Sequence, residues 1–119
     1  MGRRGRRRGA EAASAPESSY RDTEGNVLVL RGAMTPATRN EYAAALAGSP
    51  LSREDAWQRG VEFLFERLAV RWEIAGTEPI ARQRDLLGRY RFATADERHW
   101  IRDVLREHLA EHFPELEAP

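Results

Sequence analysis

The stretch from Arg53 to Glu73, REDAWQRGVEFLFERLAVRWE, decides the expected fold. Its large apolar side chains recur every three or four residues, which is the period of an α-helix that buries one face. They are Trp57, Val61, Leu64, Leu68 and Trp72, with Phe65 beside them. Ser52 precedes the stretch as a candidate N-cap, and Glu54 and Asp55 follow in the first turn, where acids meet the positive end of the helix dipole. The pattern predicts one long central helix over residues 53–73.

A second apolar strip lies on the opposite side of this predicted helix. It comprises Ala56, Phe63 and Val70, and it extends to Ile74 if the helix continues. A helix that is apolar on two opposite sides is either buried centrally or completes its packing at an interface. We expect a central helix whose second strip is partly covered by another subunit or another protein. Phe63, Val70 and Ile74 are therefore the candidate partner-binding residues.

The residues before this stretch predict a hairpin and a first helix. Residues 22–26 have turn chemistry, and the apolar, β-branched run Val27–Leu30 fits a short covered strand. Tyr20 and Arg21 are expected to pair with this strand, and such a hairpin must lie on helices because two strands are not stable alone. Thr35 and Pro36 then open a helix that stops at residues 48–50.

The residues after it predict two more helices. One spans residues 80–91, and the next opens at a capping box formed by Thr94 and Glu97 and ends at Pro114. The expected fold is mainly α, with an N-terminal β-hairpin packed on a compact bundle of about four helices. The expected organisation is one helix-rich domain over residues 20–119, preceded by a tail over residues 1–19.

Composition limits the function classes further. The chain has 119 residues, and its 19 basic residues are all arginines, balanced by 19 acids. It contains no cysteine, which excludes disulfides, thiol nucleophiles and cysteine zinc sites. It has no apolar run long enough for a membrane span, and its N-terminal arginines are not followed by an apolar signal segment. We expect a cytoplasmic protein with no membrane partner.

The tail carries a net positive charge, whereas the rest of the chain carries a net negative charge. Residues 1–19 hold five arginines, against Glu11 and Glu17, and the remainder holds 14 arginines against 17 acids. Apart from Met1 the tail has no large apolar residue, so we expect it to be disordered. An arginine–glycine tail can bind RNA or DNA electrostatically; the alternatives are an accessory tail or a start codon placed too far upstream. The candidate nucleic-acid-binding residues are Arg3, Arg4, Arg6, Arg7 and Arg8.

The last predicted helix carries all three histidines, and it suggests two kinds of chemistry. His108 and His112 stand four residues apart on one face, a spacing that can chelate a metal ion, although no third ligand is evident. Two histidines at the edge of a helix interface are the simpler interpretation. No phosphate-binding loop, catalytic triad or paired buried carboxylate is evident, so we assign no catalytic residue, metal or cofactor.

A second interpretation concerns Arg102, Asp103 and His108. Their order resembles the arginine–polar–histidine motif of HEPN nucleases, which are helical domains whose arginine and histidine meet those of a second copy. The resemblance implies that histidine and arginine assist attack by the ribose hydroxyl and stabilise charge on the phosphate. The alternative is a solvated row of arginines beside a row of acids.

From Asp22 to Leu116 the layout resembles small tail-assembly-chaperone-like proteins of siphophages and related actinobacterial prophages. The resemblance rests on the strand-like Gly25–Arg31, the threonine-then-helix entry Met34–Arg39, and the helix end near a tryptophan at Leu68–Trp72. It implies a chaperone that binds a tape measure protein and has no catalytic residues. We therefore expect a non-enzymatic protein-interaction or assembly protein, acting with a protein partner, as a homo-oligomer, or both. The alternative is a nucleic-acid-associated protein using its arginine-rich tail, including a HEPN-like ribonuclease.

Overall fold

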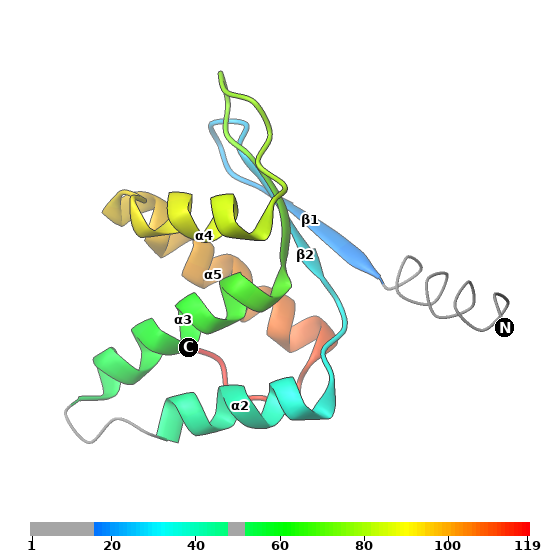
Figure 1. Cartoon of the computed structure of the whole chain (residues 1–119), viewed down its shortest axis with the longest axis vertical. Helices are drawn as coiled ribbons and strands as arrows, with labels where there is room; N and C mark the ends of the chain where they lie inside the picture. Colours follow the sequence, from blue (N-terminus) through cyan, green and yellow to red (C-terminus); the bar gives the residue numbers. More distant parts are fainter. Residues whose placement is uncertain (1–15, 48–51) are drawn as a thin grey trace, which may run out of the picture.

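The computed structural model describes residues 16–47 and 52–119, and Figure 1 shows their arrangement. Three strands form one antiparallel sheet in the order β1-β2-β3. Helices lie on one side of this sheet, with α2 farthest from its turn end (Figure 1). In chain order the described elements are β1 (Glu17–Arg21), β2 (Val27–Arg31), α2 (Pro36–Ala47), α3 (Arg53–Leu68), β3 (Ala69–Glu73), α4 (Gln83–Arg91) and α5 (Ala95–His112).

The expected fold class, a two-stranded hairpin on a helical bundle, is wrong because the central helix is shorter than predicted. Helix α3 ends at Leu68, and the chain continues directly as β3, which pairs with β2 so that Trp72 lies opposite Leu28. After Leu68 the apolar residues Val70, Trp72 and Ile74 alternate with charged ones. Alternation with a period of two is the pattern of a strand, and β-branched and aromatic residues favour it.

An irregularity in β3 adjusts the sheet just after the helix. Val29 pairs with Arg71 and Leu30 pairs with Ala69, so Val70 is the extra residue of a β-bulge. Beyond β3 the chain turns at Gly76, whose φ of 85° suits glycine. It then returns beside the strand, where Trp72 and Ile80 exchange two backbone hydrogen bonds of 2.9 Å. Helix α4 consequently begins at Gln83, later than predicted.

The first strand also differs from the expected boundary. Strand β1 begins at Glu17, so residues 17–19, which the sequence pattern places in the tail, belong to the sheet. Tyr20 lies opposite Leu28, and the Gly32 N–H donates to the Pro16 carbonyl oxygen at 2.6 Å. The rest of the expected tail, residues 1–15, lies outside the described residues.

Two helix starts that the sequence predicted are confirmed. The Ser52 side chain accepts a hydrogen bond from the Asp55 N–H at 3.0 Å at the start of α3. At the start of α5, Thr94 and Glu97 form the predicted capping box, with hydrogen bonds in both directions between them. Each cap satisfies backbone donors that a helix end otherwise leaves unpaired.

The core lies between the inner face of the sheet and α3, α4 and α5. Phe65 of α3 is at its centre, stacked on Tyr90 with ring centroids 4.9 Å apart and edge-on to Trp72 at 5.7 Å. Leu28 and Leu30 of β2 are fully buried in the same cluster. In the part of the chain that the structure describes, no helix is both long enough and apolar enough to cross a membrane.

Candidate functional site

Two histidines of α5 hold the edge strand β1 against the helix. His108 Nδ1 lies 2.7 Å from the Tyr20 hydroxyl oxygen, and His108 Nε2 lies 2.8 Å from the Arg31 carbonyl oxygen. One turn later, His112 Nε2 lies 3.0 Å from the Ser18 hydroxyl oxygen. His108 is 0% exposed, and both of its ring nitrogens are used within the fold.

These hydrogen bonds determine the tautomer of His108. A carbonyl oxygen only accepts, so Nε2 carries the proton and donates it to Arg31, while Nδ1 accepts from the Tyr20 hydroxyl. Burial lowers the pKa of His108, and the hydrogen bond to Arg31 offsets only part of this shift. The ring is therefore a neutral structural group that anchors a strand.

The same geometry bears on the metal hypothesis for His108 and His112. A metal ion needs a free nitrogen lone pair, and the Nδ1 lone pair of His108 already accepts a hydrogen bond. Within residues 16–47 and 52–119, no group of three or more histidine, cysteine, aspartate or glutamate side chains is placed to hold a metal ion. The histidine pair serves the contact between β1 and α5.

The arginine and histidine of the ribonuclease hypothesis point to different parts of the molecule. Arg102 Nη1 donates to Glu54 Oε1 on α3 at 3.2 Å, whereas His108 faces β1 and the end of β2. Six helical residues turn one side chain away from the other by about 120°. A general base must reach its substrate, and His108 is buried with both nitrogens bonded. This geometry gives the hypothesis no support.

The candidate partner-binding residues Phe63, Val70 and Ile74 do not share one helix face. Phe63 lies on α3, where it packs on Tyr42 of α2 with ring centroids 6.2 Å apart. Val70 is the bulge residue of β3, and Ile74 follows that strand. Helix α2 thus packs against Phe63, which belongs to the strip that the sequence analysis assigns to a binding partner.

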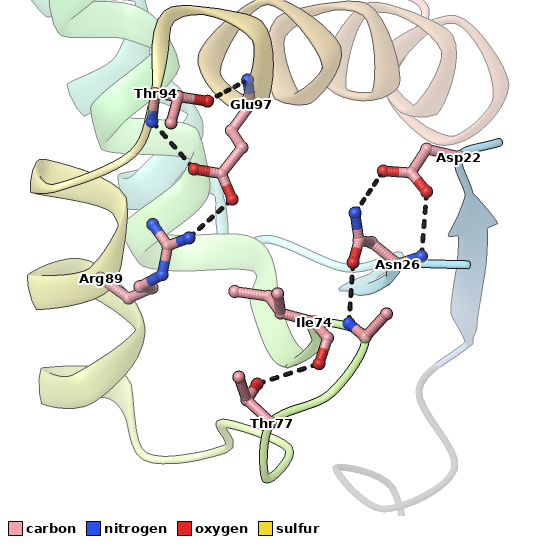
Figure 2. Close-up of polar contacts among 8 residues, drawn as sticks. Asp22, Asn26, Ile74, Thr77, Arg89, Thr94 and Glu97 are labelled. Carbon is pink, nitrogen blue, oxygen red and sulfur yellow. Dashed lines mark hydrogen bonds and ion pairs between the residues drawn. The ribbon is translucent and has the colours of Figure 1, made fainter. Parts of the chain in front are cut away.

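Ile74 lines an open groove of about 570 Å³ at the turn end of the sheet. Figure 2 shows the polar contacts along it. The Asp22 carboxylate accepts hydrogen bonds from the Asn26 side chain at 2.6 Å and from the Asn26 backbone N–H at 2.9 Å. Asn26 Oδ1 in turn accepts from the Ala75 backbone N–H at 2.8 Å. Asn26 therefore ties the β1–β2 turn to the loop after β3.

The opposite wall of this groove fixes the junction of α4 and α5. Arg89 donates to Glu97 at 2.6 Å, and Glu97 also accepts from the Thr94 backbone N–H at 2.8 Å (Figure 2). Burial alone would raise the pKa of Glu97, but the hydrogen bonds from Thr94 and Arg89 outweigh it, and the pKa is lowered. The Asp22 and Glu97 carboxylates thus hold the β1–β2 turn and the α4–α5 junction in place, so the walls of the groove stabilise the fold.

The junction of α4 and α5 presents an exposed aromatic side chain. Phe92 follows the last residue of α4 and is 87% exposed, the largest exposure of any large apolar side chain among the described residues. The junction is held by hydrogen bonds from the Phe92 N–H to the Arg89 carbonyl at 3.2 Å and from Arg98 Nη2 to the Arg91 carbonyl at 2.9 Å. Arg98 also lies over the Tyr90 ring, 5.2 Å from its centroid.

Sequence reasoning did not single out Phe92, although a signal was present. The predicted helix ends at Arg91 and the next N-cap is Thr94, so Phe92 and Ala93 form the whole connection. A large aromatic residue in so short a connection has little room to turn inward. We call Phe92, Arg91 and Arg98 the α4–α5 corner, and it lies at the left of Figure 1.

The candidate nucleic-acid-binding residues Arg3, Arg4, Arg6, Arg7 and Arg8 lie outside the described residues. Comparisons with known proteins add no identity: no protein-family model, no curated protein and no solved structure matches this chain. The functional argument therefore rests on the geometry of the described side chains.

Proposed function

We propose that this chain is a non-enzymatic interaction or assembly protein that binds a protein partner through the α4–α5 corner. The observation that carries the proposal is the 87% exposure of Phe92 on a junction of short, well-defined geometry. Burying a phenylalanine side chain is worth about 1.5–3 kcal/mol, which a partner gains on covering it.

The rigidity of the corner supports this role. The Arg89–Glu97 pair, the capping box and the Arg98 hydrogen bond fix the directions of α4 and α5 around Phe92. A surface that is ordered before binding loses little conformational entropy in the complex. Arginine is also among the side chains that most often dominate binding energy at protein interfaces, and phenylalanine is enriched there.

The most concrete form of the proposal is a cytoplasmic chaperone-like protein of the tail-assembly type. It rests on the resemblance in layout, in which a short strand precedes a helix entered through a threonine. The structure has the same order of elements in β2 and α2, with the Thr35 side chain accepting from the Thr38 N–H at 3.1 Å. In such a role the corner would hold a segment of another protein during assembly.

Site-specific crosslinking tests the proposal. Phe92 is replaced by a photoreactive phenylalanine analogue in cells of the source organism, and crosslinked products are identified by mass spectrometry. The matched control carries the analogue at Arg71, which is exposed on β3. We expect one protein to dominate the products from position 92 and to be absent from those of position 71. Products containing only RNA, or the same proteins at both positions, would contradict the proposal.

A further inference from the structure

A shallow groove of about 220 Å³ adjoins the α4–α5 corner, between the N-terminal parts of α3 and α5. Val61 and Ala95 give it an apolar lining, and Arg98 and Arg102 line it from α5. Arg98 belongs both to the groove and to the α4–α5 corner, because it lines the groove and donates to the Arg91 carbonyl next to Phe92. The groove and Phe92 therefore form one continuous surface.

Charges of both signs lie on this surface. On α5, Arg98 and Arg102 are four residues apart, about 6 Å along the helix. On α3, Glu54 pairs with Arg102 at 3.2 Å and Glu62 pairs with Arg91 at 3.0 Å. Ion pairs of this kind on the surface contribute little to stability, so the charges of a partner can replace them.

This pattern of charge distinguishes a peptide from a nucleic acid. A nucleic-acid strand carries a negative charge at every phosphate and cannot avoid the carboxylates of Glu54 and Glu62. A peptide can place acidic side chains against Arg98 and Arg102 and neutral ones against α3. It can also supply an apolar side chain that covers Phe92. The mixture of arginines and glutamates on this surface therefore favours a protein partner.

We propose that the groove between α3 and α5, together with Phe92, docks an acidic segment of a partner protein that carries at least one large apolar side chain. This inference rests on the proposed function and adds the chemistry of the partner. Complementary charge sets the register of the segment, and burial of Phe92 supplies the affinity.

A selection from random peptides displayed on yeast tests the inference without a known partner. The purified full chain is the bait, and clones that bind an unrelated control protein equally well are discarded. We expect the remaining peptides to be enriched in aspartate and glutamate around a large apolar residue. In anisotropy measurements with a labelled selected peptide, Phe92→Ala and Arg98→Glu should each weaken binding at least about tenfold.

The matched control is Arg21→Glu, which makes the same charge change at an exposed position on β1. It should bind the peptide as the wild type does, and thermal melts must show that all variants fold. Selected peptides that are neutral or basic, or binding that survives Phe92→Ala, would overturn the inference. So would tighter binding of a labelled single-stranded RNA, or self-association through Phe92 detected by sedimentation. If crosslinking at position 92 finds a protein partner while the selection fails, the proposed function stands and only the acidic-segment assignment is wrong.

Discussion

At the scale of single residues, His108 is a titratable group whose neutral form the fold requires. Its folded-state pKa is lowered chiefly by burial, whereas in the unfolded chain it returns to about 6.5. The unfolded state then binds the proton at a higher pH than the folded state does. The stability that His108 contributes is therefore complete above the unfolded pKa and is lost as the pH falls through the folded pKa.

We predict that the free energy of unfolding decreases as the pH falls below about 6.5, ahead of the carboxylate titrations. Urea unfolding at several pH values measures this slope. His108→Gln should be less stable at neutral pH and should show a flatter profile in that window. His99→Gln, on an exposed site of the same helix, should keep the wild-type slope. An unchanged slope in His108→Gln would show that the neutral ring is not required.

The sequence predicted the roles of those residues whose contacts are with near neighbours in the chain. Ser52, Thr94 and Glu97 were predictable because a helix cap depends on residues within one turn of it. The short connection at Phe92 and Ala93 was visible in the sequence, but the exposure of Phe92 also depends on how Arg89, Arg98 and their partners direct α4 and α5. The hydrogen bonds of His108 join residues 88 and 77 positions apart in sequence, and no local pattern indicates them.

At the scale of elements, the apolar stripe of α3 is not uniformly buried. Leu68 is fully buried in the core cluster, whereas Trp57 is only half-buried and does not pack against that cluster. We predict that Leu68→Ala costs about 2–5 kcal/mol of stability, the usual range for a buried leucine. Trp57→Ala should cost less than Leu68→Ala, because part of the Trp57 side chain is already in contact with water. Chemical denaturation of both variants provides the comparison, and equal losses would mean that α3 is rotated from the orientation described.

The error in predicting β3 also has a physical origin at this scale. Leu68 and Trp72 are four residues apart, which brings them to one face of a helix and equally to one face of a strand. The stripe therefore could not mark where α3 ends. The alternation of apolar and charged residues from Val70 to Ile74 could have marked the end of α3. It is not seen when the periodicity is evaluated over a window centred on the helix, because most of that window has the helical period. The strip of Phe63, Val70 and Ile74 does not form one helix face for the same reason, because Val70 and Ile74 lie beyond the end of α3.

At the scale of the whole molecule, the C-terminal segment packs against α2. Phe113 is fully buried, and Arg39 of α2 lies 5.2 Å over its ring and pairs with Glu115 at 2.6 Å. The Tyr42 hydroxyl donates to the Glu117 carbonyl oxygen at 2.5 Å. Helix α2 is thus held between α3 and the end of the chain, which makes the last residues part of the domain.

Deletion of residues 115–119 should therefore destabilise the protein, because it removes the hydrogen bond of the Tyr42 hydroxyl and the packing of Leu116 and Ala118 on the core. A hydrogen bond of this kind contributes about 0.5–1.5 kcal/mol. Tyr42→Phe removes the hydroxyl itself, so the same deletion should cost about 1 kcal/mol less in that background. Equilibrium unfolding of the wild type, Tyr42→Phe, the deletion variant and the combined variant measures the coupling between Tyr42 and the C-terminal segment. Deletion of residues 1–15 is the control and should leave the melting temperature unchanged, since their sequence offers little apolar area to bury. Additive effects of the two changes would show that the segment stabilises the protein without the Tyr42 hydrogen bond, through contacts such as the Arg39–Glu115 pair and the packing of Leu116 on the core.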